Sequence, residues 1–392
     1  MNNEMRAVLE EIDEQELIQL LKKLISIRGP TGDEKKIAQY ISSYAKDSGY
    51  SSVEMSDQWD VVARIDGKND GPRILFLTHT DHSKPADPKQ DFQPEIVEGQ
   101  EFGKSGRVIT GKGSCAPKAT LAAMLYAGKI LAKKRAKLRG SVIIATVTKD
   151  LNANHDGPRA VDENGWIDAD MAVVGEPSNN DPVIGARGIS HIAITIKGVP
   201  SHWGRPAEGS NPIWTIERIL RQIKTLVADL PSHSALGAAT LVPIHIGCEA
   251  SPPQTPSSCR IVLDRRTLPG EDTENIIQEI RDKLNHLKTE ELKIDVDLAS
   301  QMNPFEGNSE EFISKKVMEI SQAIKGQPSQ FGYLTFSSNG GYLTGKMGIP
   351  SVVLGPGNIS DIAPIEHVEV NSVVAATQIY VATAFDVLNG GP

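Results

Sequence analysis

Short apolar runs recur along the chain and divide it into a regular series of elements. These runs cover residues 74–81, 141–150, 171–177 and 349–357. They are nearly continuous and rich in β-branched residues, which is typical of strands buried on both faces of a parallel sheet. Apolar residues at helical spacing lie between them, notably over 116–134 and 311–325. The alternation predicts an α/β domain with a mainly parallel sheet flanked by helices.

The pattern changes between residues 187 and 299. Strand-like alternation, as in ISHIAITIK, is followed by a helical stretch, two more strands, a second helix and a last strand. This β-α-β-β-α-β order predicts a ferredoxin-like α+β domain. We therefore expect an α/β domain formed by residues 1–186 and 300–392, interrupted by an inserted domain at 187–299.

Composition and charge exclude several classes of protein. The 392 residues are 39% hydrophobic and 23% charged, with a formal net charge of −9. A protein that binds phosphate backbones needs a basic face, so we expect no nucleic-acid partner. No apolar run approaches the roughly 20 residues that a membrane helix needs, and the acidic N-terminus lacks the apolar segment of a signal peptide. We expect a cytoplasmic protein without a membrane partner.

The three cysteines, Cys115, Cys248 and Cys259, support the same expectation. They are too few and too scattered for a disulfide framework or a zinc knuckle. This usage suits a reducing compartment.

One loop nearly matches a nucleotide-binding motif. Gly106 to Lys112 has the glycine and lysine spacing of a phosphate loop, but Gly113 stands where a magnesium-binding hydroxyl is required. The preceding segment, EIVEGQEFGKSGRV, is too polar for a buried strand. We expect no nucleotide at this loop.

Polar groups follow the predicted strands where each strand ends. They are His79 with Asp81, Lys149 with Asp150, Glu176, and the turn from Gly355 to Gly357. Ligands of open α/β sheets bind beyond the carboxyl ends of the strands, so these groups are expected to line one crevice. The alternative is that the strands simply end in polar loops.

Six motifs in order carry a resemblance to a known family. They are HTDH, GKGSCAPKATLAAML, VVGEP, GVPSHWGRPAEGSNPI, DRRTLPGE, and GIPSVVLGPG followed by APIEHV. Together they resemble the co-catalytic zinc amidohydrolases and peptidases that include acetylornithine deacetylase, succinyl-diaminopimelate desuccinylase, aminoacylase and glutamate carboxypeptidase. The resemblance covers nearly the whole chain. It implies a catalytic α/β domain, a lid domain that forms a homodimer, and hydrolysis of a C–N bond with two bridged zinc ions.

When the family's site residues are matched to this sequence position by position, only part of the metal site is present. His79, Asp150 and Glu176 match ligand positions, and Asp81 matches a carboxylate that orients the histidine. The bridging aspartate is replaced by Ala116, the general base by Lys149, and the last metal histidine by Ile362. The resemblance therefore implies a divergent member without an intact two-zinc centre. Two possibilities are left open. The three remaining ligands hold one zinc or other divalent metal ion, or the protein has no cofactor.

Positions that contact substrate in the family are better preserved. His202 and Asn211 match lid positions, and Arg266 suits a substrate carboxylate because its guanidinium can bind both oxygens. Asn339 in SSNGG, together with Gly355 and Gly357, matches the wall that binds the substrate carboxylate.

Three interpretations remain open at this point. In the first, Lys149 supplies the positive charge of a metal, and Cys115 acts as a nucleophile with His79 as base and Asp81 behind it; a buried, inert Cys115 is the alternative. In the second, His82, His155 or His367 replaces a lost ligand. In the third, the chain is a catalytically inactive binding protein.

We favour an amidohydrolase-like enzyme of amino-acid metabolism. Its substrate is expected to be a small N-acyl amino acid, or a related amino-acid derivative, with an amide or acyl linkage. Metal-independent acyl transfer is the second choice, and a small-ligand-binding family member without activity is the third.

Overall fold

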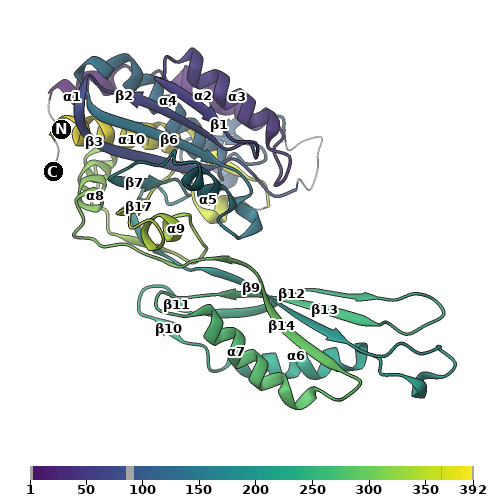
Figure 1. Cartoon of the computed structure of the whole chain (residues 1–392). Helices are drawn as coiled ribbons and strands as arrows, with labels where there is room; N and C mark the ends of the chain where they lie inside the picture. Colours follow the sequence, from purple (N-terminus) through teal and green to yellow (C-terminus); the bar gives the residue numbers. More distant parts are fainter. Residues whose placement is uncertain (1–2, 85–91, 363, 391–392) are drawn as a thin grey trace. The chain divides into compact units, whose positions relative to one another are not determined.

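The computed structural model describes residues 3–84, 92–362 and 364–390 (Figure 1). The chain forms two compact units. The first comprises Met1–Gly185, Phe305–Tyr333 and Ser338–Pro392, and the second comprises Ala186–Pro304 and Leu334–Ser337.

The first unit is built on a sheet that has nine strands among the described residues. Its order is β1-β2-β6-β3-β7-β17-β8-β15, and β16 pairs with β8. The strands are β1 Ser52–Met55, β2 Val61–Asp66, β3 Asn69–His79, β6 Arg139–Val147, β7 Met171–Val174, β8 Val183–Ala186, β15 Phe305–Glu306, β16 Gly332–Leu334 and β17 Ser351–Val353. Its centre, β6-β3-β7-β17, is parallel, while β1, β2 and β8 pair antiparallel. The predicted, mainly parallel sheet is therefore confirmed.

Helices cover this sheet because their apolar residues are spaced to form one buried side. They are α1 Asn3–Leu9, α2 Glu14–Ser26, α3 Lys35–Asp47, α4 Lys118–Lys134, α5 Asp156–Glu163, α8 Phe312–Lys325, α9 Gly340–Gly345 and α10 Val370–Gly390. Helices α4 and α10 contact each other and both contact β3 and β6, so they lie on the same face. Helix α4 is almost entirely buried, which explains its unusually apolar sequence.

The second unit has the predicted ferredoxin-like order. Its elements are β9 Ile189–Lys197, α6 Ile213–Val227, β12 Thr240–Glu249, β13 Ser258–Arg266, α7 Thr273–Leu284 and β14 Lys293–Met302. The sheet order is β12-β13-β9-β14, and every pairing is antiparallel. Alternate residues of β9, namely Ile192, Ile194 and Ile196, are buried in a core shared with α6 and α7. A short hairpin, β10 Ser232–His233 with β11 Gly237–Ala238, is separate from this sheet.

A small third sheet corrects one expectation about the phosphate-like loop. It has the order β18-β5-β4, with β4 Glu95–Glu98, β5 Arg107–Thr110 and β18 His367–Glu369. Strand β5 ends directly before Gly111, so a strand does precede the loop. It was missed because it is only 4 residues long and belongs to a separate antiparallel sheet.

The cysteines also differ from expectation. Cys248 and Cys259 lie opposite each other on β12 and β13 and form a disulfide. Counting cysteines could not reveal this, because the pairing depends on strand register. Disulfides are uncommon in cytosolic proteins, so this bridge removes the support that cysteine usage gave to a reducing compartment. Among the described residues, no helix is both long and apolar enough to span a membrane.

Gly128 offers a test of the packing of α4. A Cβ there would lie 2.0 Å from the Tyr50 hydroxyl, which donates a buried hydrogen bond to Leu125, and 2.6 Å from Ile144 Cδ1. We expect Gly128→Ala to destabilise the protein by about 1–3 kcal/mol, although alanine favours helices, because the clash outweighs the helix propensity.

The midpoint of urea unfolding measures this effect. Gly345→Ala in α9 is the matched control, since a Cβ there meets no atom within 4 Å. Equal midpoints for the Gly128→Ala variant and the wild type would contradict the proposed close packing.

Candidate metal centre

Three side chains meet at the carboxyl edge of the parallel sheet. His79 is the last residue of β3, Asp150 begins a short 3₁₀ helix (Asp150–Asn152) after β6, and Glu176 follows β7. The three strands are neighbours, so their ends meet. One ligand atom from each side chain lies within 4.8 Å of the others. His79 and Glu176 are buried, and Asp150 is half-buried.

The electrostatics of this cluster favour a bound cation. Burial raises the pKa of Glu176 to about 8, helped by the charges of Asp150 and Asp81. Burial also raises the pKa of Asp150. It pushes the pKa of His79 down, but Asp150, Asp81 and Glu176 outweigh this effect and raise it to about 10. The raised pKa values mean that the buried carboxylates are costly to ionise unless a cation lies beside them, and nitrogen with oxygen ligands suits zinc. The residues present therefore fit a divalent metal ion.

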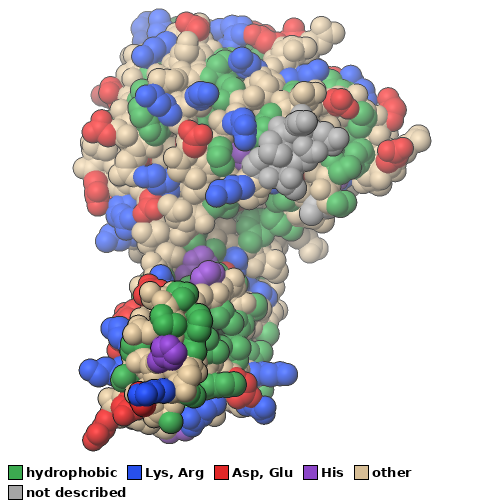
Figure 2. All heavy atoms as spheres, turned by 90° about the vertical axis from the view of Figure 1, so that its right-hand side faces the viewer, with side chains coloured by type: hydrophobic (Ala, Val, Ile, Leu, Met, Phe, Trp, Pro, Cys, Tyr) green, Lys and Arg blue, Asp and Glu red, His purple; other side chains and the backbone are tan. Residues whose placement is uncertain are grey.

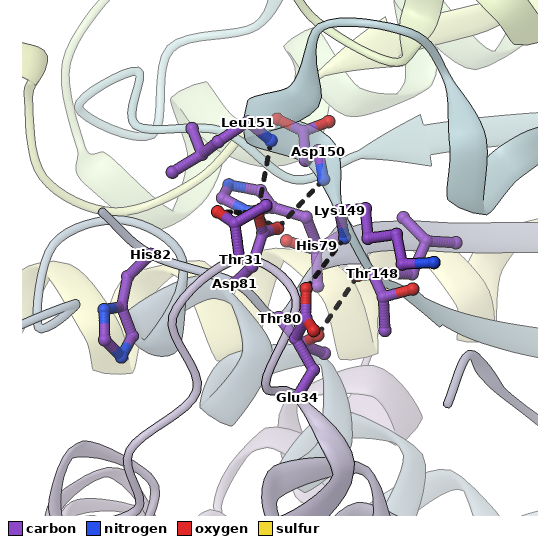
Figure 3. A network of polar contacts seen from close by, with 12 residues as sticks. Thr31, Glu34, His79, Thr80, Asp81, His82, Thr148, Lys149, Asp150 and Leu151 are labelled. Atoms are coloured by element: carbon purple, nitrogen blue, oxygen red, sulfur yellow. Dashed lines mark hydrogen bonds and ion pairs between the residues drawn. The ribbon is translucent and has the colours of Figure 1, made fainter. Parts of the chain in front are cut away.

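Asp81 holds two of these ligands in place (Figure 3). One carboxylate oxygen accepts hydrogen bonds from His79 Nδ1 at 3.2 Å and from the backbone N–H of Asp150 at 3.1 Å. The other oxygen accepts from the Thr31 hydroxyl at 2.8 Å and the Leu151 N–H at 3.1 Å. Although burial acts in the opposite direction, His79 and these donors keep the pKa of Asp81 below its usual value. Because Nδ1 is used, His79 presents Nε2 to the cluster, which supports the orienting role predicted for Asp81.

Two further carboxylates fix the segment that carries Asp150. Asp60 accepts hydrogen bonds from the backbone N–H and the hydroxyl of Thr148, at 2.8 and 2.9 Å. Glu34 accepts from the backbone N–H of Lys149 at 3.1 Å. Sequence reasoning missed both, because each carboxylate lies about 90 to 115 residues from its partner and no local motif marks it. The segment 148–151 is thus held by three buried carboxylates.

Comparison with known proteins agrees with this fold. Residues 184–291 match the family described as the peptidase dimerisation domain. Uncharacterized protein YgeY of Escherichia coli K12 is 24% identical over 384 residues, which covers 94% of this chain and 93% of that protein. Succinyl-diaminopimelate desuccinylase of Coxiella burnetii is 25% identical over 324 residues, covering 80% and 83%.

Solved structures show the same architecture. Human carnosine dipeptidase 1 superposes with a TM-score of 0.77 at 13% identity, covering 98% of both chains. The YXEP protein of Bacillus subtilis, described as a dinuclear metal-binding peptidase of the M20 family, has a TM-score of 0.67 at 15% identity and covers 96% of this chain and 98% of its own. The chain is therefore similar in sequence and fold to proteins named as M20 peptidases and desuccinylases, the group that its motifs resemble. Several of these similar proteins are named as desuccinylases or peptidases.

Lys149, which the motifs align with the family's general base, does not direct its charge at the cluster. Its ammonium donates to the Gln58 side chain at 2.9 Å, and Figure 3 shows the side chain pointing away from His79 and Asp150. The backbone of Lys149 is in the left-handed region, with a φ of 58°. The expectation that Lys149 replaces the charge of a metal is therefore wrong for this structure.

Cys115 does not form the predicted nucleophile pair with His79. Its thiol is fully buried and lies against the Asn358 carbonyl at 3.3 Å. Burial, with the charges of Glu366 and Asp361, raises its pKa far above the ordinary thiol range. His79 uses Nδ1 for Asp81 instead. The nucleophile hypothesis is wrong, and the inert, buried alternative is supported.

The phosphate-like loop does bind an anion, but one from its own chain. Glu366 accepts backbone hydrogen bonds from Gly113 at 2.9 Å, Cys115 at 3.2 Å and Ala116 at 3.1 Å. Lys112 adds an ion pair at 3.2 Å. The backbone N–H groups and Lys112 of this loop are thus already bound to a carboxylate of the same chain.

The histidines suggested as replacement ligands have other partners. The Nδ1 of His155 bonds Asn339 at 3.0 Å, and burial lowers the pKa of His155. His367 donates from Nδ1 to the Ile365 carbonyl at 2.9 Å. His82 also lies outside the three-residue cluster. In the described part of the chain, that cluster contains none of the three histidines, so their role as replacement ligands stays a prediction that the cluster does not support.

The predicted substrate wall has a structural role at two glycines. A Cβ at Gly355 would lie 2.5 Å from the carbonyl oxygen of Glu176, and one at Gly357 would lie 2.7 Å from Cys115 Sγ. Close packing therefore requires both glycines. Asn339, the third residue of the predicted wall, forms hydrogen bonds with Asp150 and His155 instead.

Two of the predicted substrate-binding residues of the second unit form hydrogen bonds with residues close to them in sequence. Arg266 binds Asp264 through Nε at 2.8 Å and through a second nitrogen at 3.2 Å. Asn211 accepts from the Ile213 N–H at 3.0 Å at the start of α6, and His202 is exposed. Their roles in substrate binding stay predictions.

His82 gives a pH-dependent prediction. It donates from Nδ1 to the Ser83 carbonyl at 2.8 Å and accepts at Nε2 from Gly29 at 3.1 Å. Burial and Lys118 lower its pKa from 6.5 to about 4. Between these values the unfolded chain binds a proton that the native protein does not, so the free energy of unfolding should fall as the pH drops, by about 3 kcal/mol in all.

Urea unfolding at about pH 7 and about pH 5 measures about 2 kcal/mol of this loss. His82→Gln should reduce the difference between the two midpoints, whereas His286→Gln, at an exposed histidine, should not. The same pH dependence in the His82→Gln variant and the wild type would contradict the assignment.

Proposed function

We propose that this chain is an M20 amidohydrolase that uses one divalent metal ion, held by His79, Asp150 and Glu176. Its substrate would be a small N-acyl amino acid or a related amino-acid derivative with an amide or acyl linkage. The observation that carries the proposal is the buried cluster of these ligand atoms, all within 4.8 Å of one another. A cytoplasmic location is part of the proposal.

The family positions that would hold a second ion support a single-metal site. Ala116 has no side-chain ligand, and its backbone N–H bonds Glu366 at 3.1 Å. Ile362 likewise replaces the histidine that the family provides. Of the ligand positions that the motifs match, His79, Asp150 and Glu176 lie together in the described part of the chain.

The bound ion would polarise the substrate carbonyl and make a bound water more acidic. The chain's own residues would fix the geometry. Asp81 holds the ring of His79 and the backbone of Asp150, and burial of Glu176 limits access of bulk water. Such pre-organisation is needed for a weak three-ligand site.

One observation favours a second candidate function. The M20 base position holds Lys149, and its ammonium lies on Gln58 rather than at the cluster. A carboxylate that takes a proton from water is therefore replaced. This favours a metal-binding family member that binds small ligands without turnover.

Metal content and activity together test the two candidates. Protein purified without chelator is expected to contain about one equivalent of zinc or another divalent ion, and His79→Ala should lose it. His286→Ala is the matched control at an exposed histidine. Turnover of N-acyl amino acids or dipeptides, lost in His79→Ala, would support the enzyme.

The outcomes are distinct. Metal binding without turnover across the panel, but with thermal stabilisation by a panel compound, would favour the binding protein. Less than about half an equivalent of metal, with no metal taken up on titration, would contradict the metal site itself.

We also propose a homodimer formed through β12. This strand lies at one edge of the sheet in the second unit, and its Val242, Ile244 and Ile246 are 49%, 53% and 47% exposed. Figure 2 shows hydrophobic side chains on the surface of this unit. An exposed apolar edge strand is a template for pairing with another chain. The match to a peptidase dimerisation domain supports a second copy as the partner.

Substitutions on the edge strand test this interface. Ile244→Lys with Ile246→Lys should convert a dimer to a monomer, as measured by light scattering after gel filtration, because buried lysines are costly. Leu298→Lys on the opposite edge strand, β14, is the control. A dimer that persists in the double variant would place the interface elsewhere.

A further inference from the structure

Asn339 joins two segments of the first unit at the metal cluster. It lies directly before α9 and is only 1% exposed. Its amide nitrogen donates to Asp150 Oδ1 at 2.8 Å, and its amide oxygen faces His155 Nδ1 at 3.0 Å. Asn339 is 189 residues from Asp150 in sequence, so this contact is made by the fold alone.

The chemistry of the three groups fixes their orientation. An ionised Asp150 carboxylate can only accept hydrogen bonds, so the Asn339 NH₂ group must face it. The Asn339 oxygen then faces His155, which must carry its proton on Nδ1 to donate. Each group thus determines the orientation of the next.

His155 is itself held by neighbouring helices. It precedes α5, is 5% exposed, and its ring lies 5.5 Å from the Tyr342 ring of α9. The Tyr342 hydroxyl donates to Asp162 of α5 at 2.9 Å. The imidazole therefore has little freedom to turn away from Asn339.

We infer that Asn339 and His155 are positioning residues for the metal ligand Asp150. Asp81 fixes the backbone of Asp150, whereas Asn339 restrains its carboxylate and leaves the second oxygen for the metal ion. Both polar ends of the Asn339 side chain are used in this arrangement, so the inference replaces the substrate-binding role expected from the motif. It rests on the proposed single-metal site.

The affinity for Zn²⁺ tests the inference without any need for a substrate. Competition with a chromophoric chelator would give the Zn²⁺ Kd of the wild type, Asn339→Leu, His155→Phe and the double variant. Asn339→Leu should raise the Kd by about 10–100-fold, as the loss of a residue that orients a ligand usually does. His155→Phe keeps the ring against Tyr342 but removes the donor, so a smaller increase is expected.

The double variant separates positioning from general stability. Once Asn339 is replaced, His155→Phe should raise the Kd no further, because its effect acts through Asn339. Tyr50→Phe is the matched control: it removes another buried hydrogen bond of the first unit, to Leu125 at 2.7 Å, and should lower the unfolding midpoint without changing the Kd.

Each outcome decides a specific point. A wild type that binds Zn²⁺ and an Asn339→Leu variant with an unchanged Kd would overturn this inference and leave the proposed function intact. Independent, additive effects of the two substitutions would overturn the coupling of His155 to Asp150. A wild type that does not bind Zn²⁺ or another divalent ion would refute both the inference and the proposed metal site.

Discussion

The Asp81 carboxylate is the group on which the geometry of the site depends. Its four hydrogen bonds connect the end of β3, the segment after β6 and the loop that contains Thr31. A buried carboxylate is costly unless it is fully paired, and here every donor belongs to a segment that the site requires. The same bonds that stabilise the charge therefore orient His79 and Asp150.

Charge balance supports the proposed site for one ion rather than two. Asp150 and Glu176, when ionised, match one divalent cation, while the charge of Asp81 is stabilised by its own hydrogen-bond donors. Ala116 stands where the family has its bridging carboxylate. The nearby carboxylate of Glu366 is already bound by the backbone N–H groups of Gly113, Cys115 and Ala116. A second ion would lack both a ligand and a compensating charge there.

The main features of the fold followed from the sequence because burial on two faces leaves a clear pattern. The runs at 74–81 and 171–177 formed neighbouring strands, β3 and β7, and their carboxyl ends brought His79 and Glu176 together. The Cys248–Cys259 bridge could not be predicted, because it depends on the register of β12 against β13. Glu34 and Asp60 were missed for the related reason that hydrogen bonds to distant backbone have no local signature.

The errors at the site share one physical cause. Aligning a motif fixes where a residue lies along the backbone, but it does not fix where the side chain points once a ligand beside it has changed. Lys149 takes a left-handed conformation and bonds Gln58, and Cys115 turns to the Asn358 carbonyl. Asn339 shows the opposite case, in which a residue expected to bind substrate directs both polar atoms inward. A buried polar group must find a partner, so the hydrogen bonds of buried polar groups are better evidence of their roles than motif positions are.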